Sequence, residues 1–145
     1  MGTLKLANDY LLWVETASPG TWVLVDGQGN FSHSRSFSAI GTATKTSQWD
    51  TERAGLPKGK ADIDILPALP DTGYARLESL CKAVPQVPFN IQVRKNGAAG
   101  ATPGDVVFAC SVTCSDFNDD KSQNEIVRAK ASFLFATAPT VDTLA

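Results

Sequence analysis

The most constraining feature of this sequence is a two-residue alternation of apolar and polar side chains. In KADIDIL, residues 60–66, Ala61, Ile63 and Ile65 alternate with two aspartates. Successive side chains of a strand point to opposite faces of a sheet, so this run predicts a strand with one buried face and one polar face. Similar strand-forming runs, bounded by turn signals such as DGQGN, are predicted over residues 10–16, 21–26, 36–47, 87–95, 105–115 and 125–137.

Only one stretch changes to a helical period. Asp71 is suited to cap a helix, and Pro85 ends it. Between them the apolar positions fall on one stripe, which predicts a helix over about 72–84; they are Tyr74, Leu77, Leu80, Cys81 and Val84.

The charged stretch WDTERAGLPKGK, residues 49–60, is too polar to be packed inside and predicts a long loop between two strands. A length of 145 residues suits one domain over 1–145, with a short flexible tail over about 138–145. The sequence therefore predicts a mainly β fold: an antiparallel β-sandwich or barrel with one flanking helix.

The polar knot DFNDDKSQNE raises the question of a calcium site. Asp116, Asn118 and Asp120 reproduce the opening of an EF-hand loop. However, Lys121 stands at the sixth position, where glycine is needed, and Val127 at the twelfth, where a bidentate glutamate is needed. We interpret the knot as the turn of a long hairpin.

Other candidates for chemistry are equally weak. His33 is the only histidine, and neither glycine-rich stretch has a phosphate-binding pattern. Asp62 and Asp64 would lie about 7 Å apart on one strand face, a spacing that suits a glycosidase pair only inside a cleft. We therefore assign no catalytic, cofactor-binding or metal-binding residue, and predict that the protein is not an enzyme.

Net charge and cysteine content limit the binding partners and the cellular compartment that the sequence predicts. A net charge of −2 gives no electrostatic footprint for nucleic-acid binding. Cys110 and Cys114, if on one strand, lie about 13 Å apart, too far for a disulfide, so reduced thiols are predicted. No signal peptide or membrane-spanning segment is apparent, which favours folding in a cytoplasm and no membrane partner.

The order of these features resembles the major tail tube proteins of long-tailed bacteriophages and gene transfer agents. The resemblance covers roughly residues 10–137. It rests on SFSAIGTATKTS leading into WDTERAGLPKGK, on KADIDIL before the helix TGYARLESLCKAV, and on PFNIQVRK before the paired finish VVFACSVTCSDF and EIVRAKASFLFATAP. Tube proteins of type VI secretion systems share this architecture.

The resemblance implies a structural virion protein that forms hexameric rings, which stack into a hollow tube for DNA delivery. It implies self-association, a tape measure protein in the lumen, a tail terminator, and baseplate or tail tip proteins as partners. DNA would be present only in passage. The protein would reside in the virion tail after assembly in the host bacterial cytoplasm, and no cofactor is implied.

Residues are assigned to this role from their charge and predicted faces. Asp62 and Asp64 are predicted to face the lumen, because the other face of their strand is apolar. Arg128 and Lys130, on the polar face of the last strand, are predicted at a subunit interface. The polar stretch is predicted to contact an adjacent subunit through Trp49, Asp50, Glu52, Arg53, Leu56, Lys58 and Lys60.

A monomeric β-sandwich binding module, for example one that binds carbohydrate, is the alternative from another class. Such modules commonly present a planar strip of exposed aromatic side chains. Trp13, Trp22 and Trp49 are the candidates for such a strip, although the first two lie in predicted strands. A tube protein of a secretion system is the other alternative.

Overall fold

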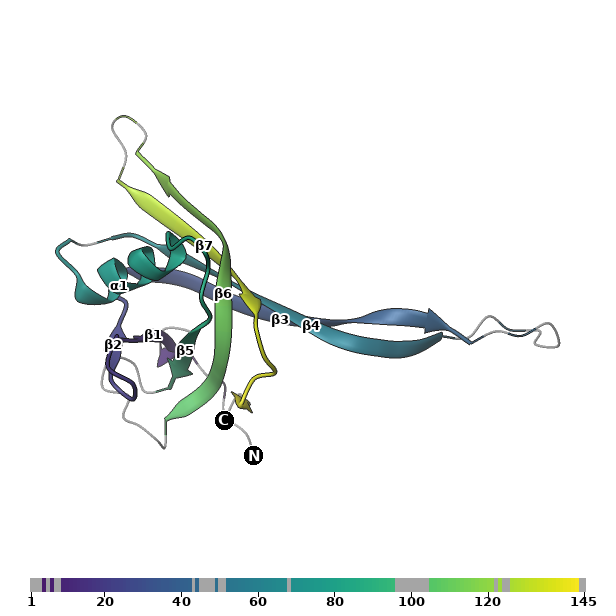
Figure 1. The fold of residues 1–145 in the computed structure, drawn as a ribbon. Coiled ribbons are helices and arrows are strands. Elements are labelled where there is room, and N and C mark those ends of the chain that lie inside the picture. The colour runs from purple at the N-terminus through teal and green to yellow at the C-terminus, as the bar shows by residue number, and fades with distance from the viewer. Residues whose placement is uncertain are drawn as a thin grey trace.

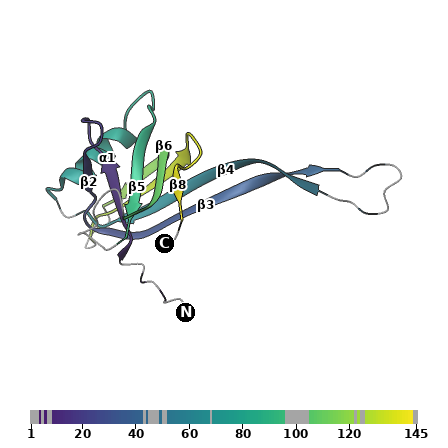
Figure 2. The ribbon, with the colours of Figure 1, turned by 90° about the horizontal axis from the view of Figure 1, so that it is seen from below.

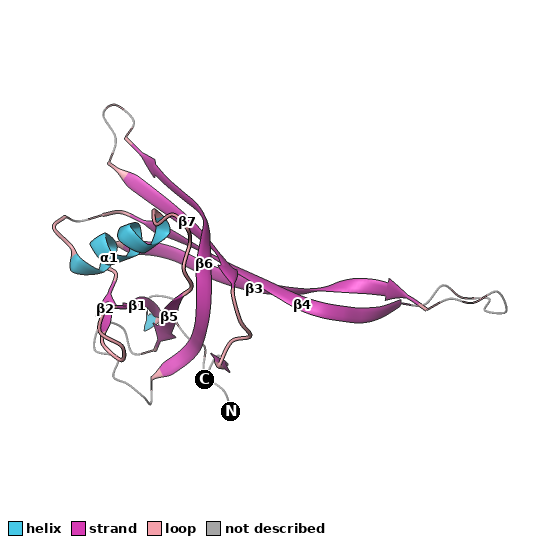
Figure 3. Cartoon of the chain, in the orientation of Figure 1, coloured by secondary structure: helices cyan, strands magenta, loops and turns pink. Residues whose placement is uncertain are grey.

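The computed structural model describes residues 4, 6, 9–42, 44, 49, 52–67, 69–95, 105–121, 123 and 126–143. Within these residues the chain forms one helix and an antiparallel sheet (Figures 1 and 3). The strands run in the order β2-β1-β5-β6-β7-β4-β3, with β8 also beside β6, and the sheet does not close. They are β1 (Leu11–Glu15), β2 (Trp22–Leu24), β3 (Gln28–Gly41), β4 (Glu52–Ile65), β5 (Phe89–Arg94), β6 (Val106–Asp120), β7 (Arg128–Phe135) and β8 (Val141–Asp142). The predicted mainly β, antiparallel fold is confirmed.

The long strand β6 belongs to two layers of this sheet. Its first part, up to Val112, pairs with β5, and its second part, from Val112 to Asp120, pairs with β7. The sheet curls so that the layers face each other: the Phe89 and Phe133 rings meet edge to face at 5.8 Å, and Phe31 lies 6.5 Å from Phe108. We call the second part of β6 with β7, β4 and β3 the four-strand layer.

A side chain bridges the first and last parts of the curled sheet. The Leu12 N–H of β1 donates to Gln28 Oε1 of β3 at 2.7 Å, and Gln28 Nε2 donates back to the Leu12 carbonyl at 3.2 Å. The side-chain amide of Gln28 thus makes the two hydrogen bonds that a backbone residue of a neighbouring strand would make with Leu12. It satisfies backbone groups that an open sheet would otherwise leave unpaired.

The core forms between the two layers, as the alternation predicts. Ala61, Ile63 and Ile65 are at most 1% exposed, whereas Asp62 and Asp64 lie on the opposite face of β4. The other fully buried side chains come from β1, β5, β6, β7, the helix and the segment after β2; the largest are Phe108, Phe133, Leu12, Leu77, Ile91, Val14, Val25 and Val112.

The predicted helix is α1 (Thr72–Cys81). It begins where expected, because the Asp71 carboxylate accepts hydrogen bonds from the N–H groups of Gly73 and Tyr74. It ends at Cys81 rather than near residue 84. Beyond that point Gln86 Nε2 donates to the carbonyls of residues 80, 81 and 83, which satisfies the end of the helix from outside.

Close packing of α1 on β2 gives a first prediction. A Cβ on Gly73 would overlap the backbone carbonyl of Leu24. Gly73→Ala should therefore lower the free energy of unfolding by about 2 kcal/mol, even though alanine favours a helix by roughly 1 kcal/mol. Urea denaturation measures this. Gly41→Ala is the matched control, since nothing lies within 4 Å of its added Cβ, and equal stability of the two variants would contradict the packing.

The loop predicted over 49–60 is wrong for residues 52–60. These residues belong to β4, which pairs with β3 from Gln28↔Ile65 out to Gly41↔Glu52. Together the two strands form a long hairpin that projects away from the rest of the chain (Figures 1 and 2). The polar composition reflects exposure on both faces of this hairpin, and β3 supplies the hydrogen-bond partners that make it a strand.

The polar knot belongs to a hairpin, as predicted, but its first half is strand rather than turn. β6 runs to Asp120 and β7 begins at Arg128, so the three EF-hand-like residues lie in extended backbone. Lys121 hydrogen-bonds to the Asp119 carboxylate and lowers the pKa of that carboxyl. One carboxylate of the knot, that of Asp119, is therefore already neutralised by a lysine of the same chain.

The stretch expected as a tail, 138–145, contains β8, which pairs with β6 at Phe108↔Asp142 and Ala109↔Val141. A two-residue strand carries too little alternation to be recognised in sequence. In the described part of the chain, no helix has the length and apolar character needed to cross a membrane.

Candidate assembly surface

The outer half of the β3–β4 hairpin carries exposed apolar side chains. We call residues 35–41 and 52–59 the arm. From Glu52 to Gly59, β3 is the only described strand beside β4, so the arm is a two-stranded ribbon. Phe37, Ile40 and Leu56 are 56%, 54% and 84% exposed. A ribbon with large apolar side chains on its surface has the properties of a contact surface rather than of a monomer's exterior.

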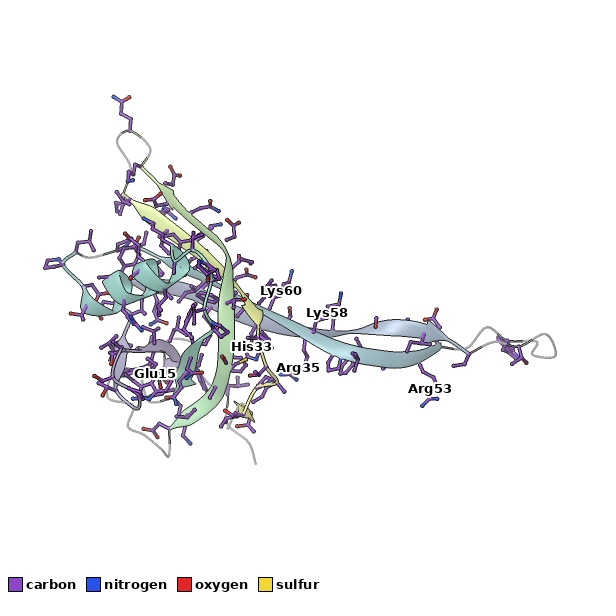
Figure 4. All side chains as sticks on the ribbon, viewed as in Figure 1. Glu15, His33, Arg35, Arg53, Lys58 and Lys60 are labelled. Atoms are coloured by element: carbon purple, nitrogen blue, oxygen red, sulfur yellow. The ribbon has the colours of Figure 1, made fainter. Side chains whose placement is uncertain are left out.

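The root of the arm is held to the C-terminal strand. Arg35 of β3 forms an ion pair with Asp142 of β8, and His33 Nε2 lies 3.5 Å from the same carboxylate. Figure 4 shows His33 and Arg35 at the root, Arg53 far out along the arm, and Lys58 and Lys60 pointing away from the side of Arg35. The arm therefore leaves the body at a fixed position.

A groove of about 610 Å³ lies beside this root. The arm contributes Phe37, Pro57 and Gly59, and the other wall is the segment from Leu134 to Pro139. Gly59 gives the Phe135 ring room to pack here, because a Cβ at this position would overlap the ring and force it to shift. The groove is largely apolar and continuous with the exposed side chains of the arm.

The four-strand layer has two open edges among the described residues. β3 pairs with β4 on one side and with no described strand on the other. β6 loses its β5 partner after Val112; Gln86 Oε1 accepts the Cys114 N–H, and no described strand covers residues 115–120 on that side. Unpaired edges are sites where another chain adds a strand.

The face of the four-strand layer turned away from the core is polar and carries both charges. Ser132 Oγ donates to Asp62 Oδ1 at 2.6 Å, and Lys130 Nζ lies 3.9 Å from Asp64 Oδ1. Arg128 stands opposite Asp120 of β6. The structure thus brings the two aspartates predicted for the lumen and the two basic residues predicted for an interface onto one face.

The residues predicted on the polar stretch lie along one strand. Glu52, Arg53, Leu56, Lys58 and Lys60 all belong to β4, and each is exposed. Trp49, before the start of β4, is 80% exposed. Asp50 lies outside the described residues.

Sequence reasoning missed the contribution of β3 and β8 to this surface. Arg35, Phe37 and Ile40 lie on the arm through strand pairing, and Asp142 fixes its root. The available signal was the adjacency of two extended polar stretches of similar length, 36–47 and 49–60, which is what a hairpin exposed on both faces produces. Within the described residues, no group of three His, Cys, Asp or Glu side chains is placed to hold a metal ion.

Comparison with known proteins defines the fold. A chain in the tail of an empty gene transfer agent particle, determined with C6 symmetry, superposes with a TM-score of 0.75 at 13% identity, over 97% of this chain and 100% of that chain. The SPP1 tail tube gives 0.72 at 10% identity, over 96% and 81%. A chain of the sheath–tube complex of an extracellular contractile injection system gives 0.60 at 9% identity, over 91% and 87%. No family model and no curated protein matches the sequence.

The fold is therefore that of the chains in phage-type tails and injection tubes. More specifically, it is the fold found in the tails of gene transfer agents and in the SPP1 tail tube, and the fold implied by the sequence resemblance is confirmed. At these low identities the likeness establishes architecture.

Proposed function

We propose that this chain is the subunit of a hollow tail tube of a long-tailed phage or gene transfer agent. The observation that carries the proposal is the four-strand layer with two open edges, from which the arm projects. A monomer would leave these edges and the apolar side chains of the arm in water. Assembly into a closed ring buries both.

The positions of the two edges support the proposed ring closure. β3 lies at one side of the layer and the second part of β6 at the other, so β3 of one subunit is placed to pair with β6 of the next. Six copies, the symmetry of the gene transfer agent tail, would join their layers into one barrel. The apolar face of each layer is covered by its own core and α1, so the polar face with Asp62 and Asp64 would line the lumen.

Contacts between stacked rings are assigned to the projecting parts. The arm reaches well beyond the body, and the β6–β7 hairpin also projects from it (Figure 1). We propose that Trp49, Arg53, Leu56 and their neighbours on the arm contact an adjacent subunit across the stack. Arg128 and Lys130 lie on the polar face at the end nearest that hairpin, and there they are proposed to meet acidic groups of a neighbouring subunit while bordering the lumen.

The remaining partners follow from the role of a tail tube. A tape measure protein would occupy the lumen during assembly, a terminator and baseplate or tail tip proteins would bound the polymer, and DNA would pass through it. The subunit would be assembled in the host cytoplasm, would reside in the virion tail, and would perform no catalysis. A tube of a contractile injection system is the second candidate, favoured by the likeness to the sheath–tube complex.

A carbohydrate-binding module is not favoured, because the three tryptophans do not form one exposed strip. Trp13 is half-buried in β1, and the Arg94 guanidinium lies 4.3 Å from its ring. Trp49 lies between β3 and β4 at the far end of the arm, away from the strands β1 and β2 that carry Trp13 and Trp22.

Sedimentation velocity of the purified chain over a range of concentrations tests the proposal. We expect the monomer to give way, as concentration rises, to a hexamer and to larger species that are multiples of it. A single monomeric species at the highest concentration would contradict self-assembly.

The polar face gives a further prediction about the lumen. Replacing Asp62 and Asp64 by lysine should yield tubes that retain DNA, because lysine rows beside Lys130 would attract phosphates where carboxylates repel them. Binding of short duplex DNA to the assembled tubes should rise at least about tenfold at low salt and fall steeply as salt increases. Asp9→Lys with Asp26→Lys, at exposed positions outside the strands, is the control for net charge. Equal DNA binding by both variants would place Asp62 and Asp64 away from the lumen.

A further inference from the structure

Helix α1 lies along the second part of β6. Near the start of the helix, the Tyr74 ring is 6.3 Å from the Phe117 ring of β6. From Tyr74 to Cys81 the helix advances about 10 Å, and from Phe117 to Cys114 an extended strand covers about the same distance. The helix and the strand run in opposite directions, so the contact at Tyr74 also brings Cys81 level with Cys114.

The side chain of Gln86 holds the end of the helix against β6 at Cys81 and Cys114. Gln86 Nε2 donates to the Cys81 carbonyl at 2.9 Å, and Gln86 Oε1 accepts the Cys114 N–H at 3.1 Å. A single amide thus links the backbones of the two cysteines. Both cysteines are partly buried at the edge of the core, and both are free thiols.

The alignment places the Cys81 side chain beside that of Cys114, whose thiol donates to the Asp116 carbonyl at 3.2 Å. Burial, and secondarily a hydrogen bond between the two thiols, raises the pKa of Cys81. This raised pKa makes Cys81 a poor first nucleophile, because the thiolate is the form that attacks an oxidant. A disulfide requires the two sulfur atoms at about 2.05 Å, and the Gln86 amide already holds the two backbones side by side for such a bond.

We propose that Cys81 and Cys114 are a disulfide-forming pair that locks α1 onto β6 when the protein meets a small-molecule disulfide. The Cys114 thiolate attacks one sulfur of the oxidant, forming a mixed disulfide and releasing one thiol. Cys81 then loses its proton and attacks the Cys114 sulfur, which releases the second thiol. The two cysteines are oxidised by two electrons, and the small disulfide is reduced to two thiols.

The lock acts within one chain and does not depend on assembly. Cytosolic thiols would keep the pair reduced, and an oxidising exterior would close it. The disulfide would hold the end of α1 against β6 just before the open edge at residues 115–120. It would constrain the long segment between positions 81 and 114 in the unfolded chain, which stabilises the folded state.

The experiment exposes the folded, full-length chain to oxidised glutathione, then blocks the remaining thiols and maps the products by peptide mass spectrometry. The number of blocked thiols should fall from three to one, with a peptide pair joined through Cys81 and Cys114. The melting temperature should rise by about 5–10 °C, and a reductant should reverse the rise.

Cys110→Ala is the matched control, because Cys110 lies on the same strand and is also buried; this variant should still form the disulfide. Cys81→Ala and Cys114→Ala should not form it. Peptide mapping of the unaltered chain identifies the cysteines that are joined, so the test holds even where a variant fails to fold. A disulfide that includes Cys110, or three free thiols under conditions that oxidise the urea-unfolded chain, would overturn the proposal.

Discussion

A chain that lacks the arm should fold normally and form no tubes. The variant replaces residues 37–57 with Asn-Gly, which closes the hairpin after the last retained pair, Ser36↔Lys58. The described residues of the removed part lie outside the hydrophobic core, so the deletion should change the free energy of unfolding by only about 1 kcal/mol. Circular dichroism and thermal melting measure the fold, and electron microscopy measures assembly.

The reason for the expected loss lies in the three apolar side chains of the arm. Burying Phe37, Ile40 and Leu56 against a neighbour would contribute on the order of 4 kcal/mol per subunit, and each ring would contribute this several times over. The triple variant Phe37→Ser, Ile40→Thr and Leu56→Ser keeps the hairpin and should also fail to polymerise. Normal tubes from either folded variant would leave the arm without a role in assembly.

Blocking the open edge of β3 should have an equally large effect. Adjacent residues of a strand direct their N–H groups to opposite sides. Of the two variants Ser34→Pro and Arg35→Pro, one therefore loses a hydrogen bond to β4. The other, the edge-only variant, loses a donor only from the open edge. The edge-only variant should remain a folded monomer and form no rings. Proline on an edge strand prevents pairing with another chain without disturbing the strand behind it.

Arg35→Ala separates the backbone effect from the side-chain effect. It removes the ion pair with Asp142 but keeps the N–H group of residue 35. We expect this variant to assemble, with an arm less firmly held at its root. If the edge-only proline variant folds and still builds rings, ring closure does not use the β3 edge.

Periodicity in the sequence was sufficient to predict the parts of the fold that have one face in the core. β4 from Ala61 to Ile65, β5 and β7 each bury every second side chain, and α1 buries Tyr74 and Leu77 on one stripe. In these elements the hydrophobic effect acts on one face only, so the pattern of burial is written directly in the residue order.

The arm could not be predicted in the same way. Both of its faces are exposed, so residues 52–59 have no alternation, and their strand conformation depends on pairing with β3. The bulge between Phe37 and Ala39 further disrupts any simple register. The clamp of Arg35 on Asp142 joins residues more than a hundred positions apart, which no local pattern reports.

The charge assignments show the same limit. Lys130 and Asp64 each appeared as an exposed charge on its own strand, and only the β4–β7 register places them opposite each other. Their lumen and interface roles are still predictions. Side-chain alternation correctly identified the polar face, but it carries no information about which neighbouring strand faces each charge.

Cryo-electron microscopy of the purified chain at high concentration tests the central claim most directly. The account predicts rings or tubes of six subunits around an open channel, with β3 of each subunit paired to the second part of β6 in the next, and with Asp62 and Asp64 facing the channel. Particles that stay monomeric, or a polymer in which the β3 edge and the edge of residues 115–120 remain unpaired, would contradict it.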